Sequence, residues 1–311
     1  MNQQDKLQNQ PEYRSFLKNA LALNGSITPK VMKKVGFIVI YSCLVSYLSY
    51  IFPSIVIPIG PFEYGGLIMG LILVFRINAG YDRWWEARKL WGTIVNQSRN
   101  LSLILVNYTS HMETASLINI IKLVVAWPYL IKDNLRNATH LQYLADFLNT
   151  EDIRLLTPAK NRPLRLASMI AQALQTARDN RSLDAFSFYH AQQQLSHLVD
   201  AHGACERILK TPMPFVMAVK ARRFILFFLI MLPFALVNVS LFLSPLIAAI
   251  VSYAIFSLDQ IGIELQNPFS ESNLSHLPLD SICKTIEQNL KETIELCIDN
   301  HDRSSFQNDN L

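Results

Sequence analysis

The hydropathy pattern begins with a long uncharged run. No Asp, Glu, Lys or Arg occurs between Val35 and Phe62, and after Glu63 the uncharged sequence resumes as far as Phe75. About 20 helical residues span the ~30 Å hydrocarbon core of a membrane, so this run is too long for one crossing. It predicts two transmembrane helices, over about 33–52 and 62–82. The turn between them is marked by four residues: Pro53, Pro58, Gly60 and Pro61.

A second uncharged run extends from Phe224 to Leu258. As one helix it would be ~50 Å long at about 1.5 Å per residue, which exceeds one bilayer. It therefore predicts two further transmembrane helices, over about 221–241 and 245–266. The turn between them is marked by Asn238, Ser240, Ser244 and the helix-breaking Pro245.

The basic residues around these runs predict the orientation of the chain. Positive charge is enriched in cytosolic loops, and the loops at 53–61 and 240–245 contain no Lys or Arg. We expect a multi-pass protein of the inner or plasma membrane with both termini in the cytosol. Its parts are a cytosolic segment 1–32, transmembrane helices in 33–82, a cytosolic helical region 83–220, transmembrane helices in 221–266 and a cytosolic segment 267–311. The basic clusters that fix this orientation are Lys30, Lys33 and Lys34; Arg83, Arg88 and Lys89; and Lys220, Arg222 and Arg223.

One more apolar stretch lies within the predicted cytosolic region, at 115–131. It is short and is interrupted by Lys122 and Pro128, so a buried helix of a soluble region is favoured over a fifth span. The rest of the region has the period of amphipathic helices, for example Leu195, Leu198 and Val199. No strand-like alternation occurs, and the expected fold class is an all-α integral membrane protein.

Composition supports this assignment. Of 311 residues, 50% are hydrophobic and only 17% are charged, against about 25% charged in average soluble domains. A net charge of +4 is too small to suggest nucleic acid as a partner. The four cysteines form no CxxC pair, and the polar N-terminus predicts no cleavable signal peptide.

Residues 75–92, FRINAGYDRWWEARKLWG, lie where the second predicted helix leaves the membrane and continues into the cytosol. Interfacial tryptophans and cytosolic arginines are ordinary membrane anchors. They do not account for the interleaved Asn78, Asp82, Glu86 and Asn96, for which we expect interhelical ion pairs and hydrogen bonds.

This stretch resembles the signature of the bestrophin family. Two other stretches support the resemblance: HGACERILKTPMPF at 202–215 and IGIELQNPFSESNLSHLPLD at 261–280. The resemblance covers about 35–290, with Ala204 in place of a usual Gly. The matching signature residues are Arg76, Asn78, Arg83, Trp84, Trp85, Glu86, Arg88 and Trp91.

The resemblance implies a homopentameric ion channel with one central pore lined by the helix at 62–82. The implied partners are other copies of the chain, the lipid bilayer and permeant monovalent ions, with no cofactor and no nucleic acid. Chloride or another anion is the family's default ion, and a sodium-selective channel of the same architecture is the alternative. A secondary transporter is less favoured because no inverted repeat is visible. No catalytic motif suggests an enzyme.

Candidate pore residues recur at i+4 on the second helix: Glu63, Leu67, Leu71 and Phe75. By resemblance, the last three match the apolar neck of the family's pore, and the alternative is a ridge that packs on helices or lipid. Five copies of Glu63 would form an acidic ring at the outer mouth, which favours cations. A lone interfacial carboxylate is the alternative.

The resemblance also implies a cytosolic constriction, placed near Phe186, although an ordinary core position is equally compatible. No metal site is expected, because His190, His197, His202, Cys205 and Glu206 fit no tight zinc motif. The calcium site of animal bestrophins is not expected either. After Asn-Pro-Phe the chain has only Glu271 and Asp280, and calcium takes about six to eight oxygen ligands.

Overall fold

A computed structural model describes residues 20–23, 25–110, 112–138 and 142–308. Within these residues the regular structure is helical, apart from an isolated bridge between Thr109 and Leu183. The helical fold class predicted from the sequence is confirmed. The chain forms two compact units, and helix α4 (Gly60–Tyr108) contributes to both. Of the described residues, unit 1 contains those within 1–82, 213–266 and 272–275, and unit 2 those within 83–212, 267–271 and 276–311.

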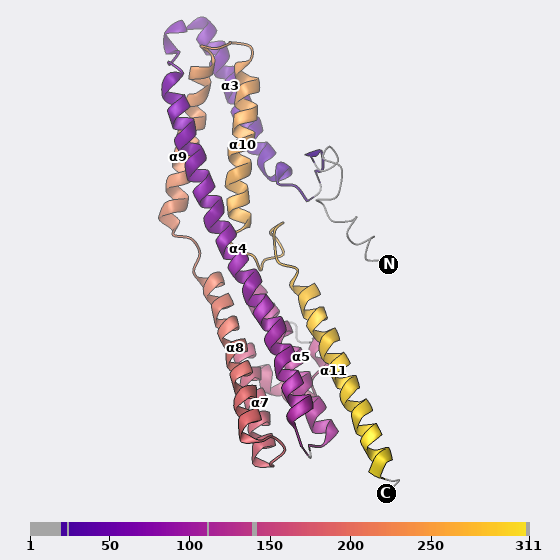
Figure 1. The fold of residues 1–311 in the computed structure, drawn as a ribbon. Coiled ribbons are helices and arrows are strands. Elements are labelled where there is room, and N and C mark those ends of the chain that lie inside the picture. Colours follow the sequence, from indigo (N-terminus) through magenta and orange to yellow (C-terminus); the bar gives the residue numbers. More distant parts are fainter. Residues whose placement is uncertain (1–19, 24, 111, 139–141, 309–311) are drawn as a thin grey trace. The chain divides into compact units, whose positions relative to one another are not determined.

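Unit 1 is a bundle of apolar helices (Figure 1). It contains α3 (Thr28–Ile51), the short 3-10 helix η2 (Pro53–Ile55), the first part of α4, α9 (Phe215–Leu236) and α10 (Ser244–Glu264). α3 packs against α10 and α9. Apolar residues of α4, α9 and α10 form its core, among them Met69, Leu73, Leu229, Leu232 and Ala248.

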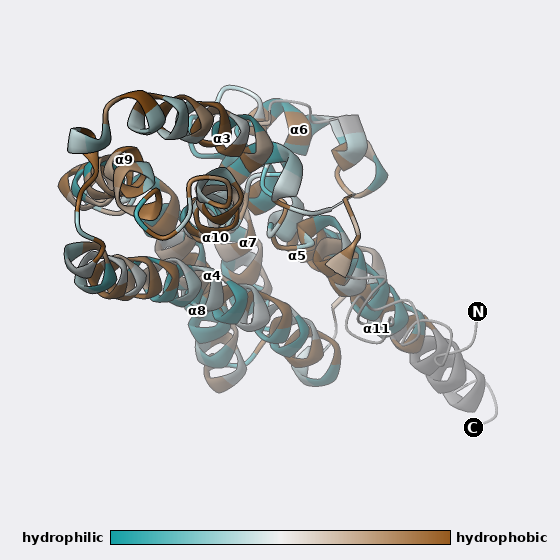
Figure 2. Cartoon of the chain, turned by 90° about the horizontal axis from the view of Figure 1, so that it is seen from above, coloured by the Kyte–Doolittle hydropathy of each residue, from teal (hydrophilic) through white to brown (hydrophobic). Residues whose placement is uncertain are grey.

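The outer surface of unit 1 is also apolar. Figure 2 shows much of α9 and α10 in brown, the colour of hydrophobic residues. Large hydrophobic side chains are exposed on each helix, for example Ile40 of α3, Phe227 of α9 and Ile250 of α10. A helix that is apolar on all sides belongs in a membrane or a larger core. Unit 1 therefore has the surface of a membrane-embedded bundle.

Helix boundaries differ from the expected ones in unit 1. The second helix extends beyond its predicted membrane span of about 62–82, as far as Tyr108, because no proline interrupts the chain between Pro61 and that residue. The third helix starts at Phe215 and ends at Leu236, three residues after the internal Pro233.

Among the residues that the structure describes, four helices are long and apolar enough to cross a membrane: α3, α4, α10 and α5 (Thr114–Arg136). α9 does not meet this standard, since Lys220, Arg222 and Arg223 occupy its first half. α5 meets it by composition although most of its apolar window is buried.

Unit 2 is built around α5. This helix packs against α7 (Arg162–Asp179), α8 (Ala185–Lys210) and α11 (Leu279–Asn308). Two short helices, η3 (Gln142–Asp146) and α6 (Thr150–Leu156), connect α5 to α7. Trp127 of α5 is fully buried and donates its indole N–H to the Pro163 carbonyl at 2.8 Å. A helix enclosed in this way has little surface left for lipid.

Candidate pore-lining surface

One face of α4 in unit 1 is apolar and uncovered. The side chains of Leu67, Leu71 and Phe75 are 75%, 55% and 63% exposed, and Glu63 one turn earlier is also exposed. Their i+4 spacing places them along a single ridge of the helix. Nothing in the described part of unit 1 covers this ridge, so it must face lipid, another chain or a pore.

The opposite face of α4 is fixed inside the bundle. Met69 and Leu73 are each 1% exposed and pack in the core with Phe228 and Leu229 of α9. Gly65 faces the same Phe228, and an added Cβ would lie 3.5 Å from that ring, an ordinary contact. This burial sets the rotation of α4 and leaves the Leu67 ridge outside.

An ion pair inside the apolar bundle fixes α4 to α10. Arg76 and Asp259 are each 5% exposed, and the Arg76 guanidinium donates to the Asp259 carboxylate. The Arg76 Nε and Nη2 atoms are buried with no partner among the described residues. A charge in such surroundings is expensive unless it is paired. Arg76 follows Phe75 directly, so this pair positions the end of the uncovered ridge.

Two glycines permit the close contact between α4 and α10. A Cβ added to Gly262 of α10 would lie 3.3 Å from Cγ of Arg76, and one added to Gly80 of α4 would lie 3.0 Å from Cβ of Leu265. Both distances are tighter than ordinary contacts, so glycine lets α4 and the end of α10 approach closely.

A second buried carboxylate closes the end of α10. Glu264 is 1% exposed and accepts hydrogen bonds from Lys30 Nζ at 2.7 Å, Gln260 Nε2 at 3.0 Å and Leu274 N at 2.7 Å. Lys30 also reaches the Ser272 carbonyl at 3.4 Å. The ammonium group of Lys30 thus joins the start of α3 to α10 and the segment that follows it.

In unit 2, α4 binds the C-terminal end of α8. The Arg83 guanidinium donates to the Ile208 carbonyl and, at 2.7 Å, to the Thr211 carbonyl. These are groups that the end of a helix leaves without intrahelical donors. Glu86 pairs with Arg207 of α8 at 2.7 Å, with both side chains largely exposed.

The tryptophans of the signature occupy different environments. Trp91 is fully buried in the core of unit 2, and Trp84 is partly buried against it. Trp85 is 47% exposed and stacks on Trp84 with a ring-centroid distance of 6.4 Å. Arg88 is exposed, with Nη1 3.7 Å from where a Cβ on Gly92 would lie.

The expectation of interhelical bonds from the polar signature residues holds for Glu86 only. Asn78, Asp82 and Asn96 are exposed, and none has a hydrogen bond or ion pair to another residue that the structure describes. These three side chains are solvent-exposed positions of α4.

Phe186 lies in the first turn of α8 and is 81% exposed, with Tyr189 exposed one turn later. Its position is set by the N-cap residue Asp184, which accepts from the amides of Phe186 at 2.8 Å and Ser187 at 3.2 Å. Hydrogen bonds from Ser187 lower the pKa of Asp184 and keep the cap ionised. The structure therefore places Phe186 on the surface of unit 2, where it can face another chain or a pathway.

The histidine and cysteine residues of α8 form no metal site in the structure. Burial lowers the pKa of His202, which lies 3.5 Å from Glu206, and burial raises the pKa of Cys205 to about 12. Glu206 accepts instead from Asn134 at 2.8 Å and Lys210 at 3.0 Å. Across the described residues, no three His, Cys, Asp or Glu side chains are grouped as metal ligands.

The two acidic residues after Phe269 are paired with cations of α5. Arg136 contacts Glu271 at 2.6 Å and Asp280 at 2.7 Å, and Lys132 contacts Asp280 at 2.8 Å. Burial acts to raise the pKa of Asp280, but Lys132 and Arg136 outweigh it and hold the pKa at about 2. Both carboxylates are therefore engaged in ion pairs with α5.

Comparison with known proteins decides the family. The sequence profile of the Bacterial/Fungal Bestrophin protein family matches residues 6–292. The chain belongs to this bestrophin family.

Several known proteins resemble the chain over nearly their whole length. A voltage-dependent anion channel-forming protein of Nostoc sp. is 33% identical over 294 residues, which cover 93% of this chain and 95% of that protein. One of Synechocystis sp. is 33% identical over 279 residues, covering 89% and 91%. The crystal structure of a bacterial bestrophin homologue from Klebsiella pneumoniae superposes with a TM-score of 0.80 at 28% identity, covering 85% of this chain and 98% of that one. Together with its apolar helices, these matches identify the chain as a membrane protein.

Two buried carboxylates of this bestrophin, Asp259 and Glu264, were not predicted from the sequence. Their importance can be inferred from their position, because both lie within the predicted span 245–266, where an ionisable side chain requires a partner. The sequence alone does not show that the partners are Arg76 and Lys30, because they lie far away along the chain.

We predict that Asp259→Leu lowers the free energy of unfolding by about 3–5 kcal/mol, because it leaves the Arg76 charge buried and unpaired. The double change Arg76→Met with Asp259→Leu should regain most of that loss. Thermal unfolding of detergent-purified protein, followed by tryptophan fluorescence, measures both. As a control, Arg207→Gln breaks the exposed pair with Glu86 and should cost less than about 1 kcal/mol. A single Asp259→Leu variant as stable as the native protein would contradict the role of the pair.

We also predict that calcium does not stabilise this bestrophin. Glu271 and Asp280 are already neutralised by Arg136 and Lys132, so too few free carboxylates remain for a site. The melting temperature of purified protein should be the same in micromolar calcium and in excess chelator. A calcium-dependent rise in that temperature would show ligands that the structure does not bring together.

Proposed function

We propose that this bestrophin is a passive ion channel whose pore is lined by the Glu63–Phe75 face of α4. The observation that carries the proposal is the uncovered apolar ridge of Leu67, Leu71 and Phe75, on a helix whose other face is fixed in the bundle. A ridge from one chain cannot enclose a pathway. We therefore propose that five copies surround one pore, as the resemblance to bestrophins implies.

The apolar ridge would act as the neck of this pore. Water leaves narrow apolar constrictions easily, so a ring of leucine and phenylalanine forms a barrier that small, partly dehydrated ions must cross. Phe186, exposed at the start of α8, is proposed as a second constriction. The signature residues Arg76, Arg83, Glu86 and Trp91 would hold α4 in place rather than contact ions.

The proposed membrane orientation follows the basic clusters and keeps both termini and the 83–220 region in the cytosol. α5 is assigned to the cytosolic region because its apolar residues are already buried in unit 2. α9 is assigned to the membrane with α3, α10 and the first part of α4. Its basic residues then lie at the cytosolic end and its uncharged part, from Phe224, lies in the bilayer.

Two selectivities follow from different observations. The relatives of Nostoc and Synechocystis are named anion channel-forming proteins, which favours chloride or another small anion. The exposed Glu63 favours a monovalent cation, because a ring of carboxylates at a pore mouth concentrates cations. Passage of monovalent ions is the function proposed here. The anion is retained as the first candidate and sodium as the second, while a transporter or an enzyme has no specific feature in its support.

Removal of the neck side chains should increase conductance. The triple change Leu67→Ala, Leu71→Ala and Phe75→Ala widens the ring and lowers its dewetting barrier, so unitary conductance in planar bilayers should rise several-fold. The assembly should keep its native elution volume, because these side chains are not part of the core of unit 1. The matched control, Ile68→Ala with Val74→Ala, changes exposed residues of the same helix and should leave conductance unaltered.

The alternative for the ridge is helix packing. In that case, each large-to-Ala change would leave a cavity costing about 2–5 kcal/mol, and the assembly would dissociate without current. A dissociated or silent triple variant therefore rejects the neck.

Replacement of the mouth carboxylate separates the two selectivities. Glu63→Gln removes one negative charge per copy and should shift the reversal potential in asymmetric salt toward the chloride equilibrium potential. Glu292→Gln, at an exposed position of α11, is the control and should have no effect. A reversal potential that does not respond to Glu63→Gln would place this carboxylate outside the pore mouth.

A further inference from the structure

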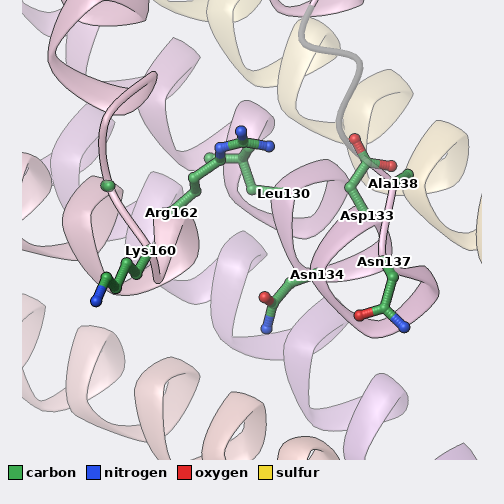
Figure 3. Close-up of a pocket in the computed structure, with 8 residues that line it drawn as sticks. Leu130, Asp133, Asn134, Asn137, Ala138, Lys160 and Arg162 are labelled. Carbon is green, nitrogen blue, oxygen red and sulfur yellow. The ribbon is translucent and has the colours of Figure 1, made fainter.

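A polar cavity lies in unit 2. It has a volume of about 410 Å³ and separates the last turns of α5 from the segment that leads into α7 (Figure 3). Binding sites for small molecules are commonly about 300–1,000 Å³. Its lining residues are Leu130, Asp133, Asn134, Asn137, Ala138, Ala159, Lys160 and Arg162.

One wall of the cavity is cationic. Arg162 and Lys160 have no ion pair or hydrogen bond to another residue in the described ranges, and the Arg162 Nε atom is buried without a partner. In Figure 3 Arg162 and Lys160 lie on the same side of the view; the Arg162 side chain extends toward Leu130 of α5, while the Lys160 ammonium group points away from the other labelled residues. A buried donor without a partner in a native protein calls for an absent ligand or water.

The same wall is the start of α7, which is rigidly held. Arg162 is the first residue of this helix, and the N-cap Asn161 accepts from the Leu164 amide at 3.1 Å. The Trp127 indole anchors the next residue, Pro163, through its carbonyl. The positive end of the helix dipole thus adds to the charge of Arg162.

The other wall presents hydrogen-bond acceptors. The Asn134 amide group directs its N–H bonds to Glu206 at 2.8 Å and to His202 at 3.3 Å, which leaves its oxygen available. Asp133 is 6% exposed and accepts from Tyr143. Because α5 ends here at the left-handed Asn137, the negative end of its dipole also faces this side. An occupant with hydroxyl or amino groups fits this wall.

We propose that this cavity binds a small organic anion that also carries hydroxyl groups, of the class of sugar phosphates. Its anionic group would pair with Arg162 at the start of α7, Lys160 would add positive charge at the rim, and its hydroxyl groups would donate to Asn134 and Asp133. A metal ion alone does not fit, because one carboxylate stands among two cations. An apolar molecule does not fit either, because five of the eight lining residues are polar: Asp133, Asn134, Asn137, Lys160 and Arg162.

The test uses the full-length protein in detergent, with ribose 5-phosphate as the probe in isothermal titration calorimetry. Ribose and inorganic phosphate are titrated separately. The proposal expects ribose 5-phosphate to bind, and to bind at least about tenfold more tightly than either part, since each part uses only one wall. Equal affinity for inorganic phosphate, equal affinity for ribose, or no binding of ribose 5-phosphate overturns it.

Variants assign the binding to this cavity. Arg162→Gln should weaken binding by about tenfold or more, the usual value of a charge-assisted hydrogen bond. Arg165→Gln, one turn further along α7 and outside the cavity lining, should bind as the native protein does. Lys160→Gln, at an exposed loop position that does not endanger folding, should weaken binding several-fold. Binding that is unaffected by Lys160→Gln and by a folded Arg162→Gln overturns the proposal.

Discussion

A charge cannot stay unpaired inside the apolar helices of unit 1, and the ion pair of Arg76 with Asp259 meets that constraint. Both side chains are almost fully buried. Each is tolerable only because of the other, since an isolated ion in such surroundings costs several kcal/mol. The pair therefore links two helices that are distant in sequence, and Gly262 gives the Arg76 side chain the room to lie against α10.

This constraint fixes the rotation of α4 about its own axis. With Arg76, Met69 and Leu73 turned into the bundle, the ridge of Leu67, Leu71 and Phe75 is turned out. The two faces of α4 are thus both apolar, but only the face that packs in the bundle is covered by other helices. That incompleteness of the single chain is the physical reason to propose a pore shared by several copies.

The sequence predicted the helical fold well because the signal was strong. Uncharged runs longer than one bilayer leave few alternatives to paired membrane helices. Helix boundaries were less well predicted, since the end of α4 at Tyr108 depends on packing in unit 2 and no residue near position 82 breaks the helix. α5 is the clearest ambiguity: its composition suits a membrane, and only its contacts with α7, α8 and α11 show that it is enclosed.

Many residues of the candidate site could be predicted from the sequence. The residues that hold the site in place could not. The i+4 spacing is enough to place Leu67, Leu71 and Phe75 on one ridge, and the family resemblance gave that ridge a role. The partners of Arg76 and Arg83 could not be predicted, because Asp259 and the carbonyls of Ile208 and Thr211 come close only in three dimensions. A buried charge requires a partner of opposite charge, but this requirement alone does not identify which residue is the partner.

The central claim is that the Leu67 ridge faces water within a pore. Leu71→Cys in a Cys43→Ser background places a thiol at the middle of the ridge, and Ile40→Cys places one on the exposed apolar face of α3. The decisive measurement is current through reconstituted protein during addition of a charged, water-soluble methanethiosulfonate reagent. The account predicts that current through Leu71→Cys is altered, that reduction restores it, and that Ile40→Cys does not respond. A Leu71→Cys protein that conducts and is as unresponsive as Ile40→Cys would contradict it.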